Sequence, residues 1–326
     1  MTAFTDLVDL AAPRLGGAVL RCNDEFFASA AHLLKAGDAV WREGEYTDRG
    51  KWMDGWETRR RRTPGHDWCI IRLGIPARIH GVVVDTSFFR GNQPERCSLE
   101  VCDATDEAVL VEPGMVRWGE LLGESHLKPD ARHPLPVEHT GRATHLRFNI
   151  FPDGGVARLR VYGEPCMHPS LVAGATADLA ALANGGLVVG CSDMSFGRVQ
   201  NLIFPGHSTH MGDGWETRRR RGPGSDWAII RLAAPGAIGR IEVDTNHFKG
   251  NAPESCSLEV CHVPDRGTAP PVAEADWKTV LPRSPLGPDG HFTFEARERI
   301  PATHARLGNH PDGGIARLRL IGVVSG

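Results

Sequence analysis

The densest group of side chains capable of chemistry is the segment DGWETRRRR at residues 54–62, which recurs unchanged at residues 213–221. Four adjacent guanidinium groups repel one another and need acidic neighbours, solvent or an anionic ligand. Arg binds a carboxylate with a planar, two-pronged fork, although a solvated or ion-paired basic strand is the competing interpretation. The candidate ligands for a substrate carboxylate are Arg59, Arg61, Arg218 and Arg220.

A second group of polar residues follows a predicted strand in VDTSFFRGN (84–92) and again in VDTNHFKGN (243–251). Polar side chains at a strand end and in the loop after it often face a ligand, but the same residue types also build turns. The candidate substrate-binding residues are Thr86, Asn92, Thr245 and Asn251. The candidate carboxylates for proton transfer are Asp85 and Asp244.

Acid–base catalysis has further candidates. Glu57 and Glu216 are flanked by Arg, and a nearby Arg lowers a carboxylate's pKa and keeps it ionised, as a base requires. The acid is then a histidine, whose unperturbed pKa of ~6.5 lies near working pH. His66 occurs only in the first copy of these motifs, and His247 occurs only in the second copy. Each copy therefore has its own acid, both contribute to one composite site, or only one copy works. A structural role is the competing interpretation for each histidine.

Several function classes lack support. The sequence contains no nucleophile-elbow, phosphate-loop, HExxH, dinucleotide or zinc-finger pattern, so no metal site or organic cofactor is recognisable. A net charge of −3 argues against nucleic acid as a partner. No apolar run approaches the ~20 residues of a membrane helix, and no signal peptide is recognisable. We therefore expect no membrane partner and a cytoplasmic location, where the 8 cysteines are mostly reduced.

The motifs recur because the chain is a duplication. From residue 54 onward the two copies align at a constant offset of 159, and 17 of the 20 residues in 54–73 match 213–232. Upstream the offset is 169, so the first copy carries ten extra residues within Lys35–Met53. A period this long indicates a duplicated domain. The predicted organisation is an N-terminal extension (1–14), a first repeat (15–163), a linker (164–171) and a second repeat (172–326).

Short strands bounded by Gly, Pro or Asp dominate each copy, and in the first they are expected at 68–73, 79–86, 97–102, 145–150 and 156–162. One helix is expected over residues 24–35, capped by Asn23 or Asp24. The predicted fold class is all-β, with two tandem homologous β-sandwiches of the jelly-roll, galactose-binding-like type.

The repeated DGWETRRRR, the paired VDT segments and PDGG-x-ARLR resemble the allantoicase family over nearly the whole chain, from about Asn23 to Gly322. The resemblance implies two jelly-roll domains, a homo-oligomer, and conversion of allantoate and water to ureidoglycolate and urea. One departure lies at residues 306–310 (RLGNH), where the pattern of residues 147–151 (RFNIF) is expected and the Asn is displaced by one position.

The implied substrate suits these residues. Allantoate is one carbon that carries a carboxylate and two ureido groups, which Arg, Asp, Asn and Thr can bind. Expelling urea needs only general acid–base catalysis, in agreement with the missing nucleophile motif. The alternative is a non-enzymatic tandem jelly-roll module that binds sugar.

Overall fold

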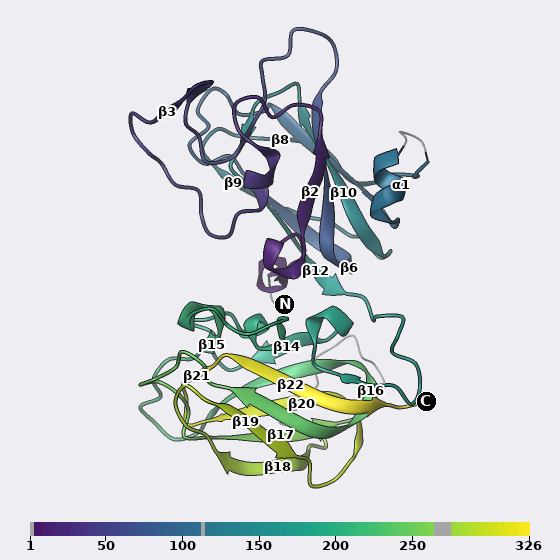
Figure 1. Ribbon diagram of the computed structural model, residues 1–326, viewed down its shortest axis with the longest axis vertical. Helices are drawn as coiled ribbons and strands as arrows, with labels where there is room; N and C mark the ends of the chain where they lie inside the picture. Colours follow the sequence, from purple (N-terminus) through teal and green to yellow (C-terminus); the bar gives the residue numbers. More distant parts are fainter. Residues whose placement is uncertain (1–2, 112–114, 264–274) are drawn as a thin grey trace. The chain divides into compact units, whose positions relative to one another are not determined.

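The computed structural model describes residues 3–111, 115–263 and 275–326, and the chain divides into two compact units, Met1–Cys166 and Met167–Gly326 (Figure 1). The boundary lies inside the segment 164–171, where the sequence predicts a linker. Each unit is built almost wholly of antiparallel strands, which confirms the predicted all-β fold class with two tandem repeats. Among the described residues, no helix is long and apolar enough to cross a membrane.

The first unit is organised by one long strand, β6 (Asp67–Asp85). The other strands of its sheet are β1 (Val8–Asp9), β2 (Ala18–Cys22), β7 (Arg96–Cys102), β8 (Gly119–His126), β9 (Arg132–Pro136), β10 (Ala143–Phe151) and β12 (Arg158–Pro165). The first half of β6 pairs with β2 and β10, and its second half pairs with β9 and β12, so β6 contributes to both layers of the sandwich. The two strands predicted at 68–73 and 79–86 are therefore halves of one element. Because β1 pairs with β12, residues 8–9 are part of this sheet rather than an extension from it.

The motif segment forms a small sheet at one end of this sandwich. β5 (Trp56–Glu57) pairs with β11 (Gly155–Val156), and the Trp56 side chain is fully buried. Gly155 is required there because a Cβ would lie 1.9 Å from the ring of Phe89. The ten-residue insertion region contributes β3 (Tyr46–Thr47) and β4 (Gly50–Lys51). The remaining short elements are η1 (Phe4–Asp6), η2 (Pro13–Leu15) and α1 (Asp106–Val111).

The helix predicted over residues 24–35 is wrong in extent and type. Only a 3-10 helix, η3 (Ala30–Leu34), forms there, with Ser29 as its N-cap. The amides of Phe27 and Ala28 both donate to the carbonyl oxygen of Glu57, so pairing with β5 satisfies them instead of a helical turn. A tertiary contact thus overrides the local helical spacing.

The second unit repeats this plan, and β16 (Asp226–Asp244) lies 159 positions after β6 with the same length of 19 residues. The other strands are β13 (Thr176–Asp178), β14 (Leu187–Cys191), β15 (Trp215–Glu216), β17 (Ser255–Cys261), β18 (Lys278–Pro285), β19 (His291–Glu295), β20 (Pro301–His310), β21 (Gly314–Ile315) and β22 (Arg317–Val324). The 3-10 helices are η4 (Leu182–Asn184), η5 (Val199–Ile203) and η6 (Met211–Asp213).

Candidate functional site

The first residue of the repeated motif is structural. Asp54 Oδ2 lies 2.5 Å from Arg158 Nη2, and the two side chains are only 5% and 4% exposed. Burial by itself raises the pKa of Asp54, but hydrogen bonds from Arg158 and Lys35 outweigh it and lower the pKa to about 2. Asp213 and Arg317 form the equivalent pair in the second unit, at 2.9 Å. These pairs tie the motif segment to the strand that follows PDGG.

The motif glutamate contacts the asparagine of the loop after the long strand in both units. Asn92 Nδ2 donates to Glu57 Oε1 at 2.8 Å, and Asn251 Nδ2 donates to Glu216 Oε1 at 2.6 Å. The prediction that flanking arginines lower the pKa of Glu57 is wrong, because burial raises it and Asn92 only partly offsets that rise. Arg59 and Arg61 contact Asp24 and Asp67 instead of Glu57.

The four arginines predicted to bind a substrate carboxylate contact carboxylates of their own unit. Arg59 Nη2 lies 2.6 Å from Asp24 Oδ2, and Arg61 Nη2 lies 3.0 Å from Asp67 Oδ1. In the second unit Arg220 is paired with Asp226, whereas Arg218 Nε lies 3.8 Å from Asp193 Oδ2 and donates to Ser195 Oγ at 2.6 Å. None of these four arginines is among the residues that line the two cavities described below. Their contacts favour the ion-paired interpretation.

The aspartate of each PDGG turn also contacts the motif, but not through a guanidinium group. Asp153 Oδ2 accepts the backbone N–H of Arg61 at 2.8 Å, and Asp312 Oδ2 accepts that of Arg220 at 2.7 Å. The turn therefore fixes the backbone of the arginine segment.

The predicted threonines are buried in the loops that follow the long strands. Thr86 Oγ1 donates to the carbonyl oxygen of Lys128 at 2.6 Å, and Thr245 Oγ1 donates to that of Gly287 at 2.7 Å. Both side chains are fully buried, so these hydroxyls hold loops together. Asp85 is likewise buried, and it accepts the backbone N–H of Ser87.

The two predicted histidines have unlike surroundings. The ring of His66 lies 4.6 Å from the ring of Phe151, centre to centre, beside a cavity of the first unit. His247 adopts a left-handed backbone conformation (φ 71°), and its Nε2 lies 3.0 Å from the carbonyl oxygen of Ser208. His247 thus contacts the loop that carries His207, without lining the cavity of the second unit.

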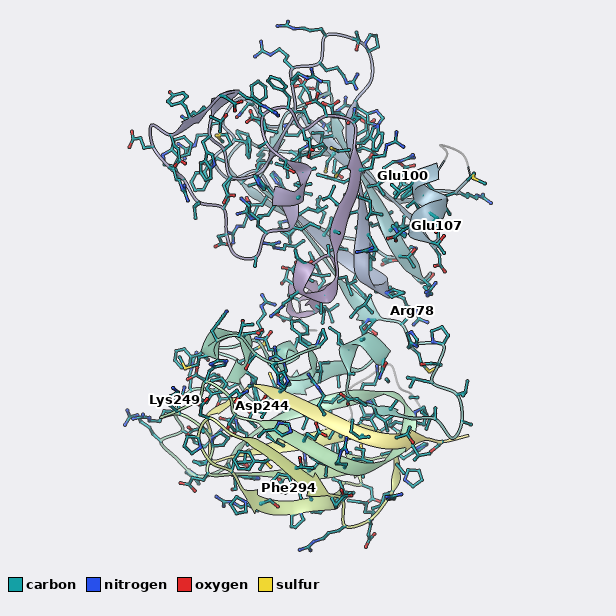
Figure 2. The ribbon with its side chains drawn as sticks, viewed as in Figure 1. Arg78, Glu100, Glu107, Asp244, Lys249 and Phe294 are labelled. Atoms are coloured by element: carbon teal, nitrogen blue, oxygen red, sulfur yellow. The ribbon has the colours of Figure 1, made fainter. Side chains whose placement is uncertain are left out.

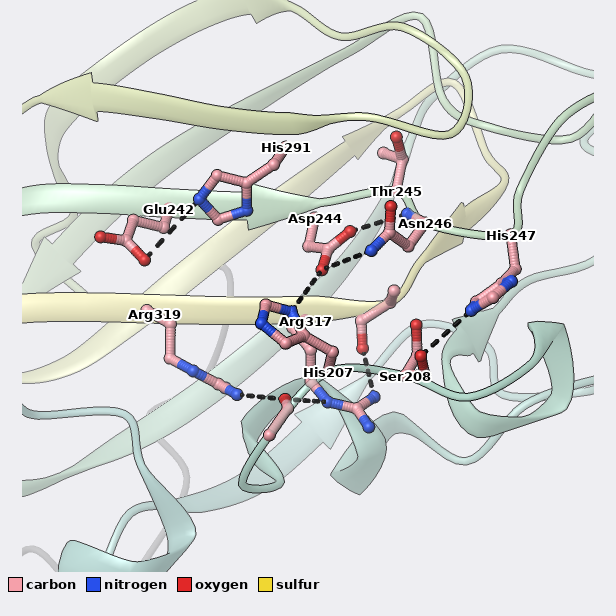
Figure 3. A network of polar contacts seen from close by, with 12 residues as sticks. His207, Ser208, Glu242, Asp244, Thr245, Asn246, His247, His291, Arg317 and Arg319 are labelled. Carbon is pink, nitrogen blue, oxygen red and sulfur yellow. Dashed lines mark hydrogen bonds and ion pairs between the residues drawn. The ribbon is translucent and has the colours of Figure 1, made fainter.

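That cavity has a volume of about 180 Å³ and gathers acidic, basic and imidazole groups from neighbouring strands (Figure 3). The floor of this cavity is formed by β19, β16 and β22, which lie side by side. Asp244 is in register with both His291 and Arg317. Figure 2 marks Asp244 within the second unit. The lining residues are Gly206, His207, Glu242, Asp244, His291, Arg317 and Arg319.

Two imidazole–carboxylate pairs face this cavity. His207 Nδ1 lies 3.9 Å from Asp244 Oδ2, and His291 Nε2 lies 3.9 Å from Glu242 Oε2. Asp244 is buried, whereas the side chain of His207 is 85% exposed and stands at the rim. Imidazole beside carboxylate is suited to proton transfer near neutral pH.

Two guanidinium groups line the floor of the cavity, and that of Arg317 is paired with Asp213 at 2.9 Å. Arg319 Nη2 donates to the carbonyl oxygens of Phe204 and Gly206 at 2.7 and 2.9 Å, and its Nε lies 3.7 Å from Asp178. Burial lowers the pKa of Arg319, so a bound anion would favour its charged form. Arg317 Nε donates to the carbonyl oxygen of Gly206 at 3.2 Å.

The first unit carries a different set at the same positions. Asp38, Val83 and Arg132 stand where the second unit has His207, Glu242 and His291. Arg132 bridges Asp38 at 2.6 Å and Asp85 at 3.3 Å, so ion pairs replace both imidazole–carboxylate pairs.

Sequence reasoning identified Asp244 but missed the other charged residues of this cavity. The differences between the aligned copies at 83/242 and 132/291 were the available signal for Glu242 and His291. Nothing in the sequence placed them beside the arginines of ARLR. Within residues 3–111, 115–263 and 275–326, no group of three or more His, Cys, Asp or Glu side chains is arranged to hold a metal ion.

Fold and site together define a duplicated β-sandwich protein whose second unit has a small cavity lined by charged and imidazole side chains. The allantoicase repeat family matches residues 8–166 and 177–325, and the chain belongs to the allantoicase family.

Individual relatives are similar in sequence to this chain over most of their own length. A probable allantoicase of Pseudomonas aeruginosa (strain UCBPP-PA14) is 48% identical, covering 98% of this chain and 96% of the relative. The allantoicase of Dictyostelium discoideum is 45% identical, with coverages of 97% and 87%. The crystal structure of allantoicase from Saccharomyces cerevisiae is 37% identical, with a TM-score of 0.80 and coverages of 97% and 92%.

Proposed function

We propose that this chain hydrolyses allantoate to ureidoglycolate and urea, and that the reaction takes place in the cavity of the second unit. Membership of the allantoicase family supports the reaction. The location is supported by one observation above the others. Two imidazole–carboxylate pairs and two arginines face the same 180 Å³ space.

The reaction needs two proton movements and no covalent intermediate with the protein. A base removes the N–H proton of the ureido group that stays, and an acid protonates the nitrogen of the ureido group that leaves. The bond from the central carbon to the leaving nitrogen breaks, releasing urea and an acyl-imine. Water adds to the imine carbon, returns a proton to nitrogen, and yields ureidoglycolate. Each acid or base contributes roughly 10²- to 10⁴-fold.

The imidazole–carboxylate pairs match these two proton movements in number. In our assignment His291, beside Glu242, and His207, beside Asp244, act as the base and the acid. Arg319 supplies the positive charge that attracts the substrate carboxylate, because Arg317 is already paired with Asp213. The N–H groups of Arg319 are engaged with backbone carbonyls, so it acts as a fixed charge rather than as a bidentate fork.

We also infer a cytoplasmic homo-oligomer. The eight cysteines are free thiols, as suits a reducing compartment. Light scattering of the purified protein measures the oligomer size, and a monomer at micromolar concentration would contradict the inference.

The site is tested by measuring urea release from allantoate by the full-length protein and two variants, His291→Gln and Glu242→Gln. Both side chains are partly exposed, at 51% and 22%, so neither change removes a core residue. We expect kcat to fall roughly 100-fold or more in His291→Gln, the loss of one acid or base. Arg132→Gln is the matched control, because Arg132 occupies the position of His291 in the first unit.

Three results are decisive. No urea release by the unmodified protein would contradict the proposed reaction. Normal kcat in both second-unit variants would contradict the proposed location while leaving the reaction intact. A loss in the control variant equal to that of His291→Gln would show that both units contribute equally to the chemistry.

A further inference from the structure

The face of the second unit formed by β17 and β20 carries a pair of side chains that the proposed reaction does not use. The two strands are neighbours in the sheet, and Ser257 is in register with Gly308 (Figure 1). Ser257 Oγ lies 2.9 Å from Nε2 of His310, two residues further along β20. Both side chains are partly exposed, and neither lines the cavity of the proposed reaction. A hydroxyl this close to an imidazole nitrogen is the arrangement of a nucleophile beside its general base.

Gly308 makes this contact possible. A Cβ at this position would lie 2.4 Å from Ser257 Oγ and 2.7 Å from His310 Nε2, so a larger residue would push the two groups apart. Without a side chain there, the imidazole reaches diagonally across the strand pair to the hydroxyl. The departure at residues 306–310, where the asparagine is displaced by one position, therefore places a glycine and a histidine where the pair needs them.

The first unit lacks the pair at the aligned positions. Asn149 stands in place of the glycine, and its Nδ2 donates to Oγ of Ser98, the counterpart of Ser257, at 3.1 Å. Phe151 stands in place of the histidine, and its ring has no nitrogen that could accept a proton. The two units therefore present the same serine with and without this neighbouring base.

The surroundings keep the imidazole in the form that a base requires. Burial lowers the pKa of His310, Arg283 lowers it further, and Glu259 partly opposes both effects. The imidazole is therefore neutral near pH 7 and able to accept the hydroxyl proton of Ser257.

Arg283 supplies positive charge beside the pair. Its Nε donates to Ser255 Oγ at 2.6 Å, and Ser255 is in register with His310. Its Nη2 lies 3.4 Å from Glu254, but these two side chains are 60% and 76% exposed. An exposed ion pair of this kind is weak, so the guanidinium remains available to an anionic group that forms at the hydroxyl.

We propose that Ser257 is a nucleophile towards small activated esters, with His310 as its general base and Arg283 as the positive charge beside the oxyanion. Ser257 Oγ attacks the ester carbonyl carbon while its proton passes to His310 Nε2. The bond from that carbon to the leaving oxygen breaks, the leaving oxygen takes the proton, and the acyl group stays on Ser257. Water then attacks the acyl carbon with the same base, releases the carboxylic acid and restores the hydroxyl. The site is independent of the proposed reaction.

The test is the reaction of the full-length protein with 4-nitrophenyl acetate. Released nitrophenolate is followed by absorbance, and mass spectrometry of peptides locates the acetyl group. Ser98 is the internal control, because it is the aligned serine of the first unit. We expect Ser257 to be acetylated roughly tenfold faster than Ser98 or more. The rate at Ser257 should level off above pH ~6.5, because the pKa of His310 lies below that ordinary value.

Two variants complete the test. His310→Phe copies the first unit and is expected to slow acetylation of Ser257 roughly 100-fold or more, the contribution of a general base. Ser257→Ala should remove the acetyl group from its peptide and leave urea release from allantoate unchanged, which separates this site from the proposed reaction. Equal acetylation of Ser257 and Ser98 in the unmodified protein, or an unchanged rate at Ser257 in His310→Phe, would overturn the proposal.

Discussion

Replacing Asp54 with Asn should destabilise the first unit substantially. The change keeps the size of the side chain and one acceptor oxygen, but it leaves Arg158 buried without its counter-charge. Removing one partner of a buried ion pair costs about 3–5 kcal/mol. The depression of the Asp54 pKa from 3.8 to about 2 corresponds to about 2.5 kcal/mol at ~1.36 kcal/mol per unit.

Both figures indicate a loss of about 3 kcal/mol in the free energy of unfolding. For a unit of this size that is about 6–12 °C in melting temperature. The assay is urea denaturation followed by hydrogen exchange of peptides covering residues 54–58 and 154–160, which reports on the first unit. The control is Glu45→Gln, because Glu45 pairs with Arg42 at 3.1 Å with side chains 41% and 57% exposed. An exposed pair of this kind contributes less than about 1 kcal/mol.

The pH dependence provides a second check. The pKa of Asp54 is lower in the folded protein than in the unfolded chain. The stabilisation is therefore complete above pH ~4 and is lost as the pH falls through the folded value of about 2. The difference between the unmodified protein and Asp54→Asn should accordingly shrink from pH 4 towards pH 2. A difference below about 1 kcal/mol at pH 7, or one that does not change with pH, would refute the reasoning.

Two further predictions concern residues that the sequence singled out. Arg59→Lys and Arg218→Lys should leave the KM and kcat for allantoate within about twofold, because each Arg contacts a carboxylate of its own unit and lines neither cavity; a tenfold rise in KM would restore them as substrate ligands. His66→Ala should keep full urea release, whereas His247→Ala should lower kcat by displacing the loop that carries His207; the reverse order in a steady-state assay would place the chemistry in the first unit.

Much of the architecture could be predicted from the sequence. The offset of 159 required two copies of one fold, and alternating short segments indicated β-sandwiches because apolar positions spaced by two can be buried only on one face of a strand. The helix expected over residues 24–35 failed because the amides of Phe27 and Ala28 find their acceptor, the carbonyl oxygen of Glu57, in a distant segment. Local spacing carries no information about such a partner.

The sequence by itself determined the duplication, the fold class and the family resemblance, since repeated motifs and strand periodicity are properties of the chain order. The tertiary structure alone decided which charged groups meet. Strand register placed Asp244 between His291 and Arg317, and burial assigned Asp54 to an ion pair with a residue 104 positions away. These outcomes depend on distances and desolvation, which exist only once strands far apart in the chain have paired.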